Sequence, residues 1–99
     1  MTFGQAGLSW LMFTVYILRD SAGRLYKGMT NNLERRLREH RSGHTKTTKR
    51  MKDLEIVYTE LYDTQVEARQ RELYLKSSAG RRFLKTKLAE VAQLVRAFA

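Results

Sequence analysis

The sequence predicts an α+β domain in which a small three-stranded antiparallel sheet is flanked by helices, in the order β-β-α-β-α-α. Three short segments rich in β-branched and aromatic residues predict the strands, and they cover residues 13–18, 25–29 and 54–62. One segment with helical periodicity follows the second of these runs, and two follow the third. Ninety-nine residues are enough for one domain with a modest core.

The first two strands are expected to form a hairpin. Residues 13–18 are apolar without alternation, which is typical of a strand buried on both faces. Turn-forming residues 20–23 follow, so the second strand can pair back. Tyr16 and Tyr26 lie on one side of this hairpin if the register brings them together, and both are equally well explained as core aromatics. Gly28 either relieves crowding at the strand end or lets a substrate backbone approach.

The first helix is expected over residues 32–41. Asn31 can serve as its N-cap, with Glu34 completing a capping box, and Gly43 suits the position just after its end. One sector of the helical wheel, about 100° wide, holds four residues: Leu33, Arg36, Leu37 and His40. This face is expected to pack on the body of the domain, so the charged guanidinium of Arg36 needs one of three surroundings. It pairs with a counter-charge, it faces a cleft that binds an anion, or the aliphatic part of the side chain packs on the two leucines while the guanidinium reaches water.

A polar loop follows this helix. Its cations Lys46, Lys49 and Arg50 alternate with hydroxyl side chains. This composition suits contacts to phosphate groups as well as an ordinary solvated surface.

The second helix opens with a capping box formed by Thr64 and Glu67. Periodicity does not single out Glu72 within it, and Glu72 can equally pair with Lys76 one turn later. The final helix, from about residue 81 to residue 98, carries one apolar stripe: Leu84, Leu88, Val91, Val95 and Phe98. This stripe must be buried on the domain, in a homodimer, or against another protein.

The net charge of +9 is concentrated in one part of the chain. Between Arg19 and Lys52 there are eleven Lys and Arg residues and three acids, a surplus of eight. A basic stripe of this kind favours nucleic acid as the partner. We expect DNA ahead of RNA. A membrane surface is the weaker rival, and part of the last helix has the composition for it.

Composition also limits the kinds of metal ion that the chain is expected to bind and indicates its cellular location. The chain has no cysteine and two histidines, so any bound metal is expected to be a hard cation such as Mg²⁺, held by few protein ligands. The longest apolar run, residues 8–18, is too short to span a bilayer, and no convincing signal peptide is present. A cytoplasmic location is therefore expected.

An ordered set of motifs resembles the GIY-YIG nuclease domain, and in particular its small single-domain bacterial members. The set begins with Tyr16 on the first strand and Tyr26-Lys27-Gly28 on the second. It continues with Asn32-Leu33-x-x-Arg36-Leu37-x-x-His40, the Lys-Thr-Thr-Lys-Arg loop, and Ala68-x-x-x-Glu72-x-x-x-Lys76. From its extent we expect a flexible arm over residues 1–11, the nuclease domain over 12–88, and an amphipathic helical extension over 89–99.

The resemblance implies a divalent-metal-dependent endonuclease, or nickase, of DNA or structured nucleic acid. It assigns catalysis to Tyr16, Tyr26, Arg36, His40 and Glu72. In that assignment Arg36 binds phosphate, Tyr26 is the general base, Tyr16 lines the site, and Glu72 holds one Mg²⁺ or Mn²⁺ ion. His40 aligns with a His or Tyr one turn after the arginine. The residues expected to bind nucleic acid are Lys27, Arg35, Lys46, Lys49 and Arg50.

Three departures from the family pattern bear on catalysis. Thr14 stands where the first motif has glycine, as it commonly does in the small members. Met29 stands where repair-type members carry a basic residue, and an Asn found downstream of the metal-binding Glu has no counterpart near Leu84. The alternative function is a nucleic-acid-binding module with this fold and little turnover. A third is an interaction protein that acts through the C-terminal stripe.

Overall fold

The computed structural model describes residues 12–46 and 48–98 and confirms the predicted α+β fold and element order. Its elements are β1 (Phe13–Arg19), β2 (Leu25–Thr30), α2 (Leu33–Arg41), β3 (Glu55–Tyr62), α3 (Gln65–Leu75) and α4 (Ser78–Phe98). The strands form one antiparallel sheet in the order β2-β1-β3. The arm predicted over residues 1–11 lies outside the described residues.

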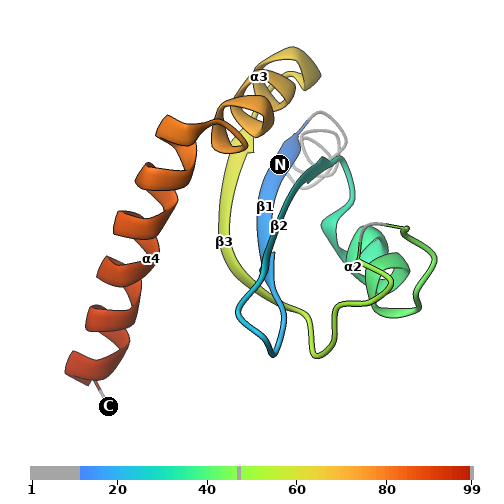
Figure 1. Cartoon of the computed structure of the whole chain (residues 1–99). Coiled ribbons are helices and arrows are strands. Elements are labelled where there is room, and N and C mark those ends of the chain that lie inside the picture. The colour runs from blue at the N-terminus through green and yellow to red at the C-terminus, as the bar shows by residue number, and fades with distance from the viewer. Residues whose placement is uncertain (1–11, 47, 99) are drawn as a thin grey trace, which may run out of the picture.

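The central strand β1 is buried on both faces because helices cover both sides of the sheet. Val15 and Ile17 pack with Ala68 of α3, Leu75 of α3 and Leu84 of α4. On the opposite face, a second buried cluster forms against α2: Tyr16, Leu18 and Leu54, with Leu33 and Leu37 packed on them. Figure 1 shows α2 on one side of the sheet and α4 on the other, with α3 across one end.

A bulge interrupts the pairing of β1 with β3. Ile17 pairs with Tyr58 and Leu18 pairs with Ile56, which leaves Val57 without a direct partner. Val57 and Tyr58 consequently pack against the same cluster, although consecutive strand residues normally face opposite ways. The bulge therefore turns an extra apolar side chain of β3 toward α3 and α4.

The helix caps agree with the sequence at one helix and differ by one residue at the other. Thr64 caps α3 by accepting a hydrogen bond from the Glu67 N–H, as predicted. In α2 the predicted N-cap, Asn31, is wrong: the Asn32 side chain accepts from the Arg35 N–H at 3.0 Å. The Thr30 hydroxyl accepts from the Asn32 N–H, and this bond fixes the chain so that the helix begins one residue later. Gly43 has φ +80° just after α2, as expected.

The last helix begins at Ser78, three residues earlier than the sequence pattern predicts. Within its apolar stripe Leu84 is buried and Leu88 is half-buried, whereas Val91 is exposed. The side chains of Val95 and Phe98 lie outside the described residues, so the partner expected for this stripe stays a prediction. None of the helices in the described part of the chain combines the length and the apolar character that crossing a membrane requires.

Gly80 allows α3 and α4 to meet in a tight corner. A Cβ atom at this position would lie 2.0 Å from the Tyr74 carbonyl oxygen and 2.5 Å from the Leu75 Cα. Both neighbours are backbone atoms, so neither can move without separating the two helices. Only a residue without a side chain fits here.

We expect Gly80→Ala to destabilise the protein by about 3 kcal/mol, because the added methyl overpacks the corner. Helix propensity alone predicts the opposite sign, since alanine stabilises a helix interior by about 1 kcal/mol relative to glycine. Thermal unfolding measures the change, with Ala89→Gly on the exposed face of α4 as the propensity control. An unchanged or raised melting temperature for Gly80→Ala would show that the corner has room.

Candidate active site

Two tyrosines and a histidine gather on the face of the sheet that α2 covers. Gly28 pairs with Tyr16, and Tyr26 pairs with the next inward-facing residue of β1, Leu18. Tyr16 and Tyr26 are therefore diagonal neighbours on one face, with ring centroids 6.2 Å apart. His40 of α2 lies edge-on to both rings, 5.8 Å from Tyr16 and 4.8 Å from Tyr26. The structure thus brings together three of the five predicted catalytic residues.

His40 is buried and hydrogen-bonded on both ring nitrogens. Its Nε2 lies 2.8 Å from the Tyr16 hydroxyl, and its Nδ1 lies 2.7 Å from the Thr48 hydroxyl. Burial lowers the pKa of His40, and the neighbouring Arg36 charge lowers it further. The imidazole is therefore neutral at neutral pH and links β1 to the loop after α2.

Gly28 leaves room for the end of the Tyr16 side chain. A Cβ atom at Gly28 would lie 2.6 Å from both the Cζ and the hydroxyl oxygen of Tyr16. Of the two explanations open from the sequence, the structure supports relief of crowding. The space is filled by Tyr16, so it is not a channel for substrate.

Arg36 lies at the edge of this cluster with its side chain one-third exposed. Its Nη1 donates to Glu39 at 2.9 Å. Glu39 and the hydroxyl of Tyr16 raise the pKa of Arg36 above its usual range, so the guanidinium is permanently charged. Of the alternatives that the sequence left open for a cation on this face, the counter-charge is present, and it is Glu39.

Tyr16 is held in its protonated form. Burial raises its pKa to about 12, although the nearby Arg36 charge acts in the opposite direction. This hydroxyl therefore keeps its proton at neutral pH. It can position His40 and Arg36, but it is poorly suited to accept a proton.

Glu72 lies on the other side of the sheet, on α3. It is buried, and its carboxylate oxygens accept from Arg69 Nη1 at 2.9 Å and from Lys76 Nζ at 3.2 Å. Among the described residues no hydrogen bond or salt bridge joins Glu72 to Tyr16 or His40. The pairing with Lys76 that the sequence left open is therefore formed.

The donors available for a metal ion are few. The described residues hold no group of three His, Cys, Asp or Glu side chains that could bind an ion together. A single carboxylate fits an ion that keeps most of its water, as Mg²⁺ does. Arg69 and Lys76 are about half exposed, so either can release an oxygen of Glu72 to such an ion.

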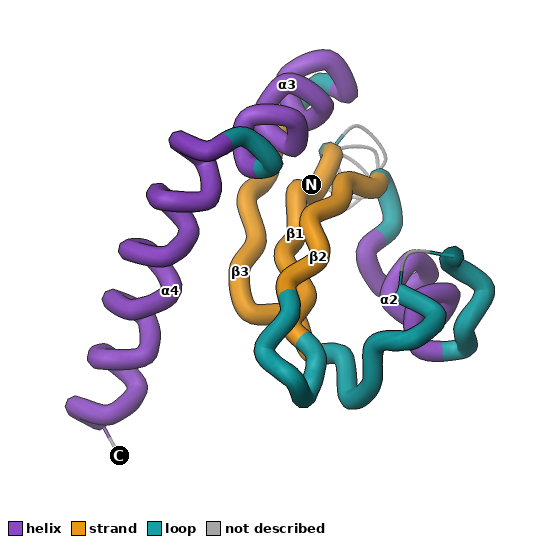
Figure 2. Tube along the Cα trace, in the orientation of Figure 1, coloured by secondary structure: helices purple, strands orange, loops and turns teal. Residues whose placement is uncertain are grey.

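The five residues predicted to bind nucleic acid do not form one surface. Figure 2 shows that the loop after α2 runs beside this helix. In this loop Lys46, Lys49 and Arg50 are exposed. Arg35 is exposed on α2 and lies 3.7 Å from Glu39. Lys27 pairs with Ile17, so its side chain leaves β2 on the face covered by α3 and α4.

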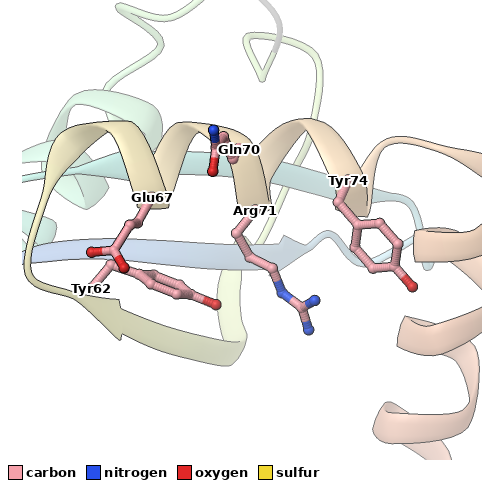
Figure 3. A pocket seen from close by; sticks show the side chains of 5 residues that line it. All are labelled: Tyr62, Glu67, Gln70, Arg71 and Tyr74. Carbon is pink, nitrogen blue, oxygen red and sulfur yellow. The ribbon is translucent and has the colours of Figure 1, made fainter.

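Two pockets in the described part of the chain are lined by other residues. One, of about 410 Å³, is lined by Arg41, Met51, Asp53 and Leu54. Figure 3 shows the other, of about 320 Å³, between Tyr62 and α3. Beside it the guanidinium of Arg71 forms a bidentate pair with Glu60, at 2.8 and 3.1 Å, and lies over the rings of Tyr74 and Phe83. This network fastens α3 to β3 and includes no predicted catalytic residue.

Sequence reasoning missed Thr48 and Glu39. Nothing in the alternation of cations and hydroxyls distinguishes Thr48 as the one that bonds to a buried histidine. Glu39 carries a weak signal, because a carboxylate three residues after Arg36 lies on the same side of a helix.

Comparison with known proteins identifies the family. Residues 12–86 match the GIY-YIG catalytic domain. UPF0213 protein CPE1444 of Clostridium perfringens is 41% identical over 63 residues, which are 63% of this chain and 68% of that relative. UPF0213 protein SSP2268 of Staphylococcus saprophyticus is 35% identical over 72 residues, which are 72% of this chain and 88% of that relative.

A solved structure also aligns with the chain. The solution NMR structure of the UPF0213 protein BH0048 from Bacillus halodurans has a TM-score of 0.49 and 29% identity, over 76% of this chain and 83% of that one. None of these three names states an activity. The family match covers well over half of the sequence, and the chain therefore belongs to the GIY-YIG catalytic domain family, whose domains are of the nuclease type.

Proposed function

We propose that this protein is a divalent-metal-dependent endonuclease that hydrolyses or nicks a phosphodiester strand of DNA or structured nucleic acid. One observation carries the proposal: a charged, partly exposed Arg36 sits at the edge of the hydrogen-bonded cluster of Tyr16 and His40. Hydrolysis of a phosphodiester needs a fixed positive charge at the phosphate and a group that accepts a proton from water. The cluster offers a candidate for each.

Arg36 is proposed to bind the scissile phosphate. Its Nη1 is engaged by Glu39, and its Nη2 and Nε can present paired N–H groups to phosphate oxygens. Tyr26 is proposed as the general base, since Tyr16 retains its proton. His40 and Tyr16 would then orient Tyr26 and Arg36 and would exclude water from behind them.

Glu72 is proposed to hold one Mg²⁺ or Mn²⁺ ion. Such an ion, when bound, stabilises negative charge on the phosphate and the leaving oxygen. Glu72 itself would supply a buried oxygen as a ligand. In the free protein Arg69 and Lys76 balance its negative charge, and a bound ion would replace one of these two cations.

The second candidate is a nucleic-acid-binding module with little turnover. It is favoured by the state of Glu72, whose two oxygens are both already occupied by cations. Both functions predict binding that weakens with salt, because both use phosphate contacts. Only the first predicts cleavage that depends on a metal and on Arg36.

We expect Arg36→Ala to slow single-turnover cleavage by at least about 100-fold, on the order of 3 kcal/mol of transition-state stabilisation. Arg36→Lys should recover little, because a point charge does not replace the paired donors of a guanidinium. Arg38→Ala, which removes an exposed arginine from the same helix, is the matched control and should cut almost normally. Normal cleavage by Arg36→Ala would contradict the proposed role of Arg36 at the phosphate, and with it the nuclease proposal.

We expect Glu72→Gln to abolish cleavage in Mg²⁺ or Mn²⁺ while binding of nucleic acid in EDTA is retained. The amide keeps the shape of the side chain but is a much poorer ligand for a hard cation. Glu67→Gln, on an exposed turn of the same helix, should behave as the parent protein. If Glu72→Gln cuts at the parental rate, the ion is held elsewhere or is not needed.

Thr48→Val is expected to lower the free energy of unfolding by about 1–3 kcal/mol, because a buried His40 nitrogen loses its hydrogen-bond partner. Cleavage should fall as well, since His40 then no longer holds Tyr16 in one position. Thr48→Ser should recover most of both quantities.

Thr45→Val is the matched control for this experiment. The Thr45 hydroxyl is buried and has no partner in the described structure, so its removal should leave stability unchanged or slightly raised. Melting curves and single-turnover rates of Thr48→Val and Thr45→Val, measured side by side, test whether the bond from Thr48 to His40 affects stability and cleavage. Equal behaviour of Thr48→Val and Thr45→Val would show that the bond to His40 contributes nothing.

A further inference from the structure

Three cations, one on β2, one at the end of α3 and one in α4, are directed toward the corner between α3 and α4. Lys27 leaves β2 on the same face as Ile17, which packs against both helices. Lys76 directly follows Leu75 of that core cluster, and Arg81 lies in the first turn of α4 and donates to the Lys76 carbonyl oxygen at 2.8 Å. Burial lowers the pKa of Lys27, and the nearby charges of Arg81 and Lys76 lower it further.

Little negative charge balances this corner. Glu72 is the carboxylate that contacts Lys76, and it is shared with Arg69. The first turn of α4 contains no acidic residue, so the positive end of the helix dipole adds to the side-chain charges. The Lys27 ammonium group makes no hydrogen bond or salt bridge with any other described residue. The Lys27 charge is therefore without a carboxylate partner among the described residues.

We propose that Lys27, Lys76 and Arg81 form a phosphate-binding site for the nucleic acid backbone, next to Glu72 and on the opposite side of β2 from the tyrosine cluster. A phosphate group would supply the negative charge that the corner lacks. It would also replace Glu72 as the partner of Lys76, which would free one oxygen of Glu72. Since β2 is an edge strand, one nucleic acid strand can reach both Arg36 and this site by passing along that edge.

This inference rests on the proposed function for the identity of the ligand, but its test needs no cleavage. Binding of labelled single-stranded and duplex oligonucleotides is measured in EDTA over a series of salt concentrations. Lys27→Met and Arg81→Met should each weaken binding about fivefold to tenfold near 0.1 M salt and should flatten the plot of log affinity against log salt by about one contact. Arg82→Met removes the same charge from the next position of α4 and should have a clearly smaller effect.

Lys27→Met separates the binding role from a structural one. Because the Lys27 charge is disfavoured where it lies, its removal should leave the melting temperature unchanged or raise it. Affinity and salt slope equal to those of Arg82→Met would overturn the proposal, and so would a lowered melting temperature with unaltered binding. Loss of cleavage in Arg36→Ala together with normal binding by Lys27→Met would reject this site and leave the proposed activity standing.

Discussion

The buried imidazole of His40 needs a hydrogen-bond partner on each side, and much of the arrangement around it follows from that requirement. Tyr16 supplies one partner from the centre of the sheet, and Thr48 supplies the other from the loop after α2. The same two bonds hold helix and loop against the strand, since an unpaired polar atom at this depth would cost about 1–3 kcal/mol. Gly28 is part of the same constraint, because a side chain there would displace the Tyr16 hydroxyl. The residues around His40 that resemble a catalytic set are therefore also residues on which the packing of α2 against the sheet depends.

The sheet separates two kinds of chemistry. On the α2 face lie neutral, hydrogen-bonding groups with one guanidinium at their edge. On the α3 face lie a buried carboxylate and the cations that surround it. Strand β2 is at the edge of the sheet, so a ligand can pass from one face to the other around this strand. Contact with a substrate along this edge would join groups that make no direct contact in the free protein.

The positively charged residues of the chain differ in whether they have a carboxylate partner. Several arginines are paired within their own helix, as Arg38 is with Glu34 and Arg35 is with Glu39. Exposed pairs of this kind contribute little to stability, typically about 0–1 kcal/mol. The cations of the loop and of the α3–α4 corner have fewer such partners among the described residues. The cations that have no carboxylate partner are the ones that a polyanion can bind.

The sequence by itself determined the strands, the helices, the cap at Thr64 and the docking face of α2, because these depend on periodicities and on hydrogen bonds within a few residues. It also indicated the family, since the motifs retain their order and spacing along the chain. Tertiary structure decided which hydroxyl of the loop bonds to His40, which side chain fills the space at Gly28, and which cations share Glu72. It also decided the bulge opposite Ile17, which places Val57 and Tyr58 against one cluster. These choices rest on contacts between residues far apart in sequence or on alternatives of nearly equal local energy, and only the packing of the whole chain distinguishes them.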